Sequence, residues 1–205
     1  MTGILAACIA ALARLASGAS VRCVDDHPCR GQCIFFANHC SHLDFVVLWS
    51  VLPKDLRART RPVAAKDYWE ADRLRRYAAT RVFRAVLIDR QGGSLGQLRA
   101  QMDQLIEALD AGDSLIIFPE GTRGSGLEIG PFKSGLDYLA RQRPNVDLVP
   151  VHLHNLYRIM PKGEFLPVPQ LSCVSFGPPL RLQEGESKAA FLLRAREAVE
   201  SLKPS

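Results

Sequence analysis

Two short polar clusters in this 205-residue chain carry side chains that could do chemistry. The first runs from Asn38 to Asp44 and places His39 five residues before the carboxylate of Asp44. If a tight turn brings these two together, Asp44 can accept a hydrogen bond from Nδ1–H of His39 and leave Nε2 free as a general base. No serine accompanies the pair, so the nucleophile would be a substrate hydroxyl. The alternative is an ordinary helix start at Asp44, capped by Asn38 or Ser41.

The second cluster, Phe118-Pro119-Glu120-Gly121-Thr122-Arg123, supplies an acid, a glycine and a permanent cation. The planar guanidinium of Arg123 suits a bidentate contact with phosphate, and Gly121 lets a substrate approach the backbone. Together with a histidine base, this set suits transfer of an acyl group onto an anionic alcohol. A third polar pair, Asp89-Arg90, is equally compatible with a plain ion pair at a strand end.

The elements that must position these clusters are visible as a recurrence. Apolar runs of strand length at 34–37, 85–88 and 115–118 are each followed at once by polar residues, which is typical of strands covered on both faces. Helical spacing is found at 45–52, 68–83, 95–109 and 188–202, and further strands are expected at 148–151 and 171–176. Alternation of strands and helices predicts parallel pairing, so we expect the polar clusters at the carboxyl ends of neighbouring strands.

Length and composition predict a single domain. The chain is 47% apolar and shows neither a linker nor an internal repeat, so one sizeable core is expected. Its six cysteines are sparse for this length and lack a paired metal-binding spacing. We therefore expect reduced thiols rather than a disulfide framework or a metal site.

Positive charge is concentrated between Lys54 and Arg90, where eleven Lys and Arg residues face five acids, while the net charge of the whole chain is +5. Such a segment suits an anionic membrane surface or a phosphorylated substrate, and an ordinary solvated helix face is the alternative. Nucleic acid is disfavoured as a partner because no recognised binding motif accompanies the charge.

The N-terminal segment is apolar from Ile4 to Ala16 except for Arg14. This run is too short to span a bilayer, which needs about 20 residues. A secretory signal is disfavoured because no Lys or Arg precedes the run. An interfacial membrane anchor is therefore favoured over a packed core helix.

Taken together, these blocks resemble the glycerolipid acyltransferases, and most closely the lysophosphatidic acid (1-acylglycerol-3-phosphate) acyltransferases. The His-x4-Asp core of the family's first block is matched by His39 and Asp44, and its Ile-Asp-Arg block by residues 88–90. The Phe-Pro-Glu-Gly-Thr-Arg block is present letter for letter at 118–123. The family's Phe-Lys-x-Gly segment matches 132–135, and its apolar block around a proline matches 149–151.

The resemblance implies a single-domain, three-layer α/β/α fold with a largely parallel mixed sheet, similar to glycerol-3-phosphate acyltransferase. It divides the chain into a membrane-associating helix at 1–20 and an acyltransferase domain at 21–205. It implies peripheral or monotopic attachment to the cytoplasmic face of the cell membrane.

The resemblance also implies a reaction. His39 would deprotonate the sn-2 hydroxyl of a lysophospholipid acceptor as it attacks an acyl thioester, carried by coenzyme A or acyl carrier protein, with no metal and no other cofactor. Asp44 would orient His39. The glycerol phosphate would be held by the third block and by added positive charge, that is by Glu120, Gly121, Thr122, Arg123, Arg90 and Lys66.

Several alternatives use other residues. The acceptor could be another lysolipid. A serine hydrolase is one alternative, because Gly92-Gly93-Ser94-Leu95-Gly96 matches the nucleophile-elbow pattern. Three residues, however, separate that pattern from the strand. Cys40 is expected to be a small buried residue rather than a nucleophile. His152 and His154 would share one strand face but lack a third metal ligand. A non-catalytic lipid-binding adaptor is the remaining alternative.

Overall fold

The computed structural model describes residues 2–24, 31–41, 43–89, 94–126, 128–156 and 171–204. Its strands are β1 (Ser20–Cys23), β2 (Cys33–Ala37), β3 (Thr60–Ala65), β4 (Val86–Ile88), β5 (Ser114–Ile117), β6 (Asp147–His154) and β7 (Cys173–Phe176). Its helices are α1 (Thr2–Ser17), α2 (Asp44–Val51), α3 (Lys54–Ala58), α4 (Lys66–Trp69), α5 (Arg73–Tyr77), α6 (Leu95–Asp110), α7 (Gly135–Gln142) and α9 (Lys188–Glu200), with a π-helical turn, η1 (Ala78–Val82).

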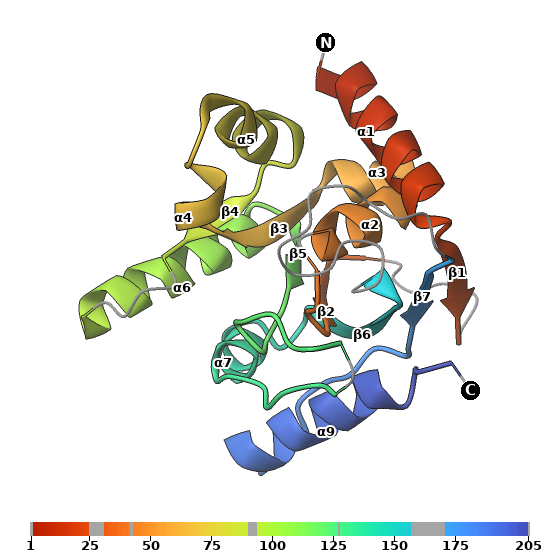
Figure 1. Cartoon of the computed structure of the whole chain (residues 1–205). Helices are drawn as coiled ribbons and strands as arrows, with labels where there is room; N and C mark the ends of the chain where they lie inside the picture. Colours follow the sequence, from red (N-terminus) through yellow and green to blue (C-terminus); the bar gives the residue numbers. More distant parts are fainter. Residues whose placement is uncertain are drawn as a thin grey trace.

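Within the described residues, seven strands form one sheet in the order β1-β7-β6-β2-β5-β3-β4 (Figure 1). Every neighbouring pair is parallel except β6 and β7. β2 lies in the middle, between β6 and β5, with Phe35 aligned to Val149 on one side and to Ile116 on the other. The predicted α/β fold with a largely parallel mixed sheet is confirmed.

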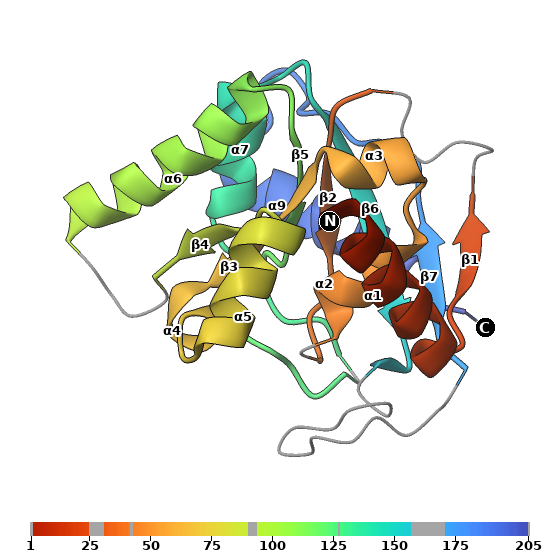
Figure 2. The ribbon, with the colours of Figure 1, turned by 90° about the horizontal axis from the view of Figure 1, so that it is seen from above.

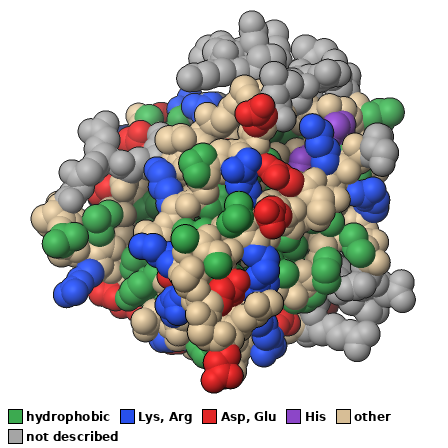
Figure 3. Space-filling view, turned by 90° about the horizontal axis from the view of Figure 1, so that it is seen from below, with side chains coloured by type: hydrophobic (Ala, Val, Ile, Leu, Met, Phe, Trp, Pro, Cys, Tyr) green, Lys and Arg blue, Asp and Glu red, His purple; other side chains and the backbone are tan. Residues whose placement is uncertain are grey.

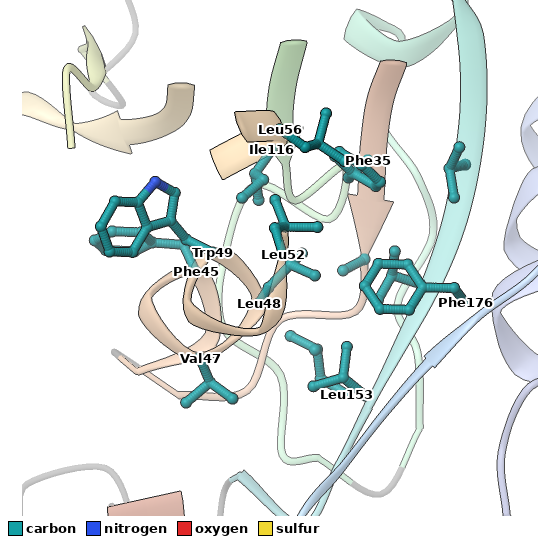
Figure 4. Packing of buried hydrophobic residues seen from close by; sticks show 14 of the residues in the cluster. Phe35, Phe45, Val47, Leu48, Trp49, Leu52, Leu56, Ile116, Leu153 and Phe176 are labelled. Atoms are coloured by element: carbon teal, nitrogen blue, oxygen red, sulfur yellow. The ribbon is translucent and has the colours of Figure 1, made fainter. Parts of the chain in front are cut away.

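Alternating side chains of β2 serve two separate hydrophobic clusters. Phe35 and Ala37 point to the cluster that includes α2, whereas Ile34 and Phe36 point to the cluster built with α6, α7 and α9. Both clusters are almost fully buried, which explains why β2 is apolar at every position. Figure 4 shows the first cluster, in which Leu48 of α2 lies between the sheet and the rest of the helix. Two helical layers therefore enclose the sheet.

The two helical layers differ in their outer surfaces. α1, α2, α3 and α5 lie on one side of the sheet, and α1 packs across α2 (Figure 2). The opposite side, which carries α7 and α9, shows basic and acidic side chains interleaved (Figure 3). Several of these form ion pairs, including Arg194 with Glu186 at 2.7 Å and Arg196 with Glu200 at 2.8 Å. Charges of both signs on this side indicate a surface in contact with water.

The basic segment departs most from the sequence expectation. The predicted helix at 68–83 is divided into α4, α5 and η1, and the segment also contains α3 and β3, which we did not expect. β3 separates β5 from β4, so β4 lies at the sheet edge and the three polar clusters do not follow three adjacent strands. Apolar, charged and proline residues alternate irregularly in β3 (Thr-Arg-Pro-Val-Ala-Ala), which hides its strand character.

The N-terminal run forms α1, and none of the helices in the described residues has the length and apolar character needed to cross a bilayer. α1 leads directly into β1, an edge strand paired with β7. Cys8, Cys23, Cys40 and Cys173 are free thiols, as expected. Cys33, however, is disulfide-bonded, so the expectation of reduced thiols is wrong for that residue.

Candidate active site

The carboxyl ends of β2 and β5 bring the two polar clusters together. His39 follows β2, and its Nδ1 lies 2.8 Å from Oδ2 of Asp44. A carboxylate can only accept, so Nδ1 carries the proton and Nε2 is left as the basic nitrogen. Within the described residues, Nε2 has no protein hydrogen-bond partner. The predicted His39–Asp44 contact is therefore present, and its geometry is that of an oriented general base.

Asp44 is held by the turn that it helps to form. Its Oδ2 also accepts hydrogen bonds from the backbone N–H groups of Cys40 at 2.6 Å and Ser41 at 2.8 Å, and the side chain is fully buried. The Cys40 thiol donates to Oδ1 at 3.7 Å, so Cys40 is a small buried residue of this network. The expected cap is wrong: Leu43 occupies the N-cap position of α2 and no side chain caps the helix.

The side chain of Asn38 forms hydrogen bonds with the backbone of β6. Its Nδ2 donates to the carbonyl of Leu153 at 3.0 Å, and its Oδ1 accepts from the N–H of Leu153 at 2.7 Å. The side-chain amide therefore continues the pairing of β2 with β6 by one more step, and it fixes the point at which the His39 turn leaves the sheet.

Glu120 supports the same turn from the β5 side. Its Oε1 accepts from the backbone N–H of His39 at 2.7 Å, and its Oε2 accepts from that of Gly130 at 2.9 Å. Burial raises the pKa of this carboxyl, while the two backbone hydrogen bonds act in the opposite direction. Both oxygens are thus used by the protein's own backbone. A direct contact between Glu120 and an acceptor phosphate stays a prediction.

The His39 ring stacks on Phe118, with ring centroids 4.3 Å apart and an interplanar angle of 22°. One side of this stack opens into a cavity of about 230 Å³ between β3, β5, α4, α6 and α7. Most of the lining is apolar and includes Phe45, Trp69 and Leu139. The same cavity is lined by two cations, Arg123 and Lys133, beside the histidine. Such a site can accept an apolar chain that ends in an anionic head.

The remaining predicted binding residues are spread around this cavity. Gly121 lines it, with a φ of +70° that favours glycine, and Thr122 is exposed beside it. Lys66 begins α4 at the end of β3 and is exposed, next to Ala65, which lines the cavity. Arg90 lies outside the described residues.

One residue of the cavity, Lys133, was not among the predicted site residues. It follows Phe132, whose ring packs edge-on against Phe36 at 6.2 Å. The backbone N–H of Lys133 donates to the carbonyl of Pro119 at 2.9 Å, which places the residue on the second polar cluster. The Phe-Lys-x-Gly segment was the signal that could have identified it.

Ser94 has a structural role, and the two histidines have no further metal ligands among the described residues. Ser94 is the N-cap of α6, where its hydroxyl accepts from the N–H of Gln97 in a capping box. His152 and His154 share a face of β6, with ring centroids 6.1 Å apart. Among the described residues, no group of three or more His, Cys, Asp or Glu side chains could hold a metal ion.

The chain is similar in sequence to known acyltransferases. The model of the Acyltransferase family matches residues 20–154. The chloroplastic 1-acyl-sn-glycerol-3-phosphate acyltransferase BAT2 of Brassica napus is 40% identical over 68 residues, which are 32% of this chain and 20% of that protein. A probable 1-acyl-sn-glycerol-3-phosphate acyltransferase of Mycoplasma pneumoniae is 33% identical over 103 residues, 48% of this chain and 36% of that protein. The matches thus span about a fifth and about a third of these relatives.

The fold is shared with a solved structure. The crystal structure of the 1-acyl-sn-glycerophosphate (LPA) acyltransferase PlsC from Thermotoga maritima superimposes with a TM-score of 0.71 at 19% identity. The superposition covers 95% of this chain and 78% of that one. At this level of identity the similarity establishes the architecture.

Proposed function

The chain belongs to the acyltransferase family, and on that premise we propose that it transfers a fatty acyl group from a thioester to the sn-2 hydroxyl of 1-acylglycerol-3-phosphate, giving phosphatidic acid. The observation that carries the proposal is the oriented His39–Asp44 pair at the edge of an apolar cavity that also contains Arg123 and Lys133. The names of the two curated relatives support the choice of acceptor.

The proposed step uses His39 as the general base. Nε2 removes the proton of the acceptor hydroxyl while the hydroxyl oxygen attacks the carbonyl carbon of the thioester. The tetrahedral intermediate then collapses, the carbon–sulfur bond breaks, and the proton on His39 is returned to the leaving thiolate. Asp44 holds the ring in the required tautomer and stabilises the imidazolium that forms between the two transfers. The donor in this proposal is the thioester of coenzyme A or of acyl carrier protein.

The apolar cavity supports a lipid substrate. Apolar residues of β3, β5, α6 and α7 line it, and the histidine and the two cations line the same cavity. An acyl chain buried there would gain roughly 0.8 kcal/mol for each methylene removed from water. His39, Arg123 and Lys133 line the same cavity, so we expect the chain to be oriented with its reacting carbonyl or its headgroup next to the base.

The chain's place at a membrane is also a proposal. We infer that residues 1–20 attach the acyltransferase domain, residues 21–205, to the cytoplasmic face of the cell membrane without spanning it. α1 supports this inference, because Ile4, Leu12 and Leu15 are 75%, 64% and 80% exposed on a helix whose Ala10 is fully buried. These three bulky side chains thus face outward, whereas Ala6, Ile9 and Ala10 pack against the protein.

The test is acyl transfer by the purified chain, with acyl-coenzyme A and 1-acylglycerol-3-phosphate as substrates and phosphatidic acid measured by mass spectrometry. His39→Ala should lower the turnover number by roughly 10² to 10⁴, because it removes general-base assistance. Ser94→Ala serves as the matched control. It should keep its activity, since the hydroxyl caps α6.

Two results would contradict the proposal. Release of free fatty acid without an acceptor, lost in Ser94→Ala, would indicate a hydrolase. Binding of lysolipid without any turnover, with either the coenzyme A thioester or the acyl carrier protein thioester as donor, would indicate an adaptor.

A further inference from the structure

A lysine is placed directly over the glycine of the second polar cluster. A β-carbon added to Gly121 would lie 2.6 Å from Nζ of Lys133 and 2.9 Å from its Cε, closer than non-bonded atoms approach. Glycine is favoured here by its φ of +70°, and a side chain at this position would in addition require the flexible end of Lys133 to shift. The ammonium group lies against the backbone of the turn that joins Glu120 to Arg123.

The position of Lys133 is fixed by its neighbours. Phe132, the residue before Lys133, is only 8% exposed and lies in the core. The backbone N–H of Lys133 donates a hydrogen bond to the carbonyl of Pro119. The side chain itself is exposed, so a ligand can reach it from the cavity that it shares with His39 and Arg123.

Both cations of this cavity lack a counter-ion in the described part of the chain. Neither Arg123 nor Lys133 forms an ion pair or a side-chain hydrogen bond there, whereas arginines such as Arg84 and Arg141 are paired with buried aspartates. Two unpaired cations beside a general base form a site for an anion with more than one negative charge.

We propose that Lys133 is a substrate-binding residue that contacts the acceptor phosphate together with Arg123, and that this pair selects a phosphomonoester headgroup. The inference rests on the proposed function and adds a specificity-determining residue to the same site. A phosphomonoester carries a charge of about −1.5 to −2 at neutral pH, which two cations can match. A phosphodiester carries one negative charge, and the ammonium of a choline or ethanolamine headgroup would be repelled.

The experiment measures acceptor preference. Wild type and Lys133→Met are assayed with one acyl-coenzyme A and two acceptors that share an acyl chain, 1-acylglycerol-3-phosphate and lysophosphatidylcholine. Methionine keeps an unbranched apolar side chain, one atom shorter than that of lysine, and removes the charge. The KM for the phosphomonoester should rise roughly 10- to 100-fold, as expected for the loss of one charge-assisted contact. The KM for the donor and the turnover number should change little.

Two variants control for charge and geometry. Lys188→Met removes an exposed lysine at the start of α9, outside this cavity, and should leave both KM values unchanged. Lys133→Arg keeps a cation and should retain a preference for the phosphomonoester. If Lys133→Met has the same thermal unfolding midpoint as the wild type, a folding defect is excluded.

A binding measurement separates this inference from the proposed function. Calorimetric titration of the wild type with sn-glycerol 3-phosphate, and with inorganic phosphate as the comparison, needs no turnover. Tighter binding of glycerol 3-phosphate that is weakened in Lys133→Met supports the site even if acyl transfer is absent. Active wild-type enzyme together with unchanged acceptor KM and unchanged binding in Lys133→Met overturns the inference alone. Absence of binding by the wild type overturns it as well.

Discussion

One oxygen atom, Oδ2 of Asp44, connects the chemistry of the site to its backbone. It accepts from Nδ1 of His39 and from two consecutive backbone N–H groups, so the carboxylate fixes the turn and the tautomer at once. An orienting group that is bonded three times cannot rotate away from the imidazole. This is the preorganisation that a general base needs, because the geometry does not have to be assembled during the reaction.

The substitution Asp44→Asn should therefore strongly reduce the rate of acyl transfer. The amide removes the negative charge that stabilises the imidazolium, and its NH₂ group can donate to Nδ1 and move the proton to Nε2, the wrong tautomer. We expect the turnover number to fall by roughly 10² to 10⁴. The measurement is the steady-state rate, with circular dichroism to show that the fold is kept.

Asp137→Asn is the matched control. Asp137 is buried in α7 and paired with Arg141, and it does not line the His39 cavity. It should retain the wild-type turnover number. Equal activities of the two variants would show that the Asp44 carboxylate is dispensable.

The sequence predicts the His39–Asp44 contact because the two residues are close in the chain and a single turn can join them. It does not predict the two backbone hydrogen bonds of Glu120. The bond to His39 spans 81 residues and depends on β2 and β5 being neighbours in the sheet. The position of Lys133 over Gly121 has the same origin, since it follows from the loop path after β5 and from the packing of Phe132.

Among the helices, α1 exposes several bulky apolar side chains. Ala6, Ile9 and Ala10 pack against the core on the side that contacts α2 and η1, while Ile4, Leu12 and Leu15 face outward. α5 lies on the same side of the sheet and exposes Leu74 and Tyr77. A helix whose large apolar residues face away from the protein is better suited to the interface of a bilayer than to water.

We predict that replacing Ile4, Leu12 and Leu15 together by serine weakens binding to lipid vesicles by more than tenfold. Burying one such side chain is worth about 1.5–3 kcal/mol, and the inward face of α1 is left intact. Co-sedimentation with anionic and neutral vesicles is the measurement. High salt should release part of the wild-type protein from anionic vesicles only, because each Lys or Arg near such a surface adds about 1 kcal/mol that salt screens.

The control replaces Leu95, Leu98 and Leu193 by serine, three exposed leucines of α6 and α9. This variant should bind vesicles like the wild type. If both triple variants bind equally well, α1 does not hold the protein at the membrane.

Strand and helix positions were predictable where hydrophobicity is simple. β2, β5 and β6 are buried runs, and α6 and α9 have helical spacing, so their bounds agree with the sequence to within a few residues. β1 and β3 were missed. β1 is exposed at each of its positions and β3 alternates buried and half-buried positions, so neither has the continuous apolar signal of a central strand. Their place in the sheet is set by partners far along the chain.

A buried histidine of β6, the strand against which α9 packs, makes the stability of the fold sensitive to acid. His152 is only 6% exposed, and its Nδ1 has no hydrogen-bond partner within the described residues. Burial lowers its pKa from 6.5 to about 4, with further lowering by the nearby cations His154, Lys203 and Arg22. His152 is therefore neutral in the folded protein across the range in which the unfolded chain would bind a proton.

The free energy of unfolding should consequently fall as the pH drops from about 6.5 to 4. In this window the unfolded chain binds more protons than the folded one, so acid favours unfolding, by up to about 3 kcal/mol. Urea unfolding at a series of pH values tests this. His152→Phe should reduce the slope in this window, and His154→Gln should preserve most of it. An unchanged slope in His152→Phe would assign the acid sensitivity to other groups.

The pairing of β1 with β7 has a consequence for synthesis. Ser20 bonds to Ser172, 152 residues later, so β1 cannot join the sheet until that distant segment has left the ribosome. α1 precedes β1 and emerges first, with its outward leucines already able to meet a lipid surface. Domains fold as units and long-range strand pairing is slow, so the order of events can be attachment first and closure of the sheet second. On this route the nascent chain would complete its fold at the surface of the bilayer to which we propose that it attaches.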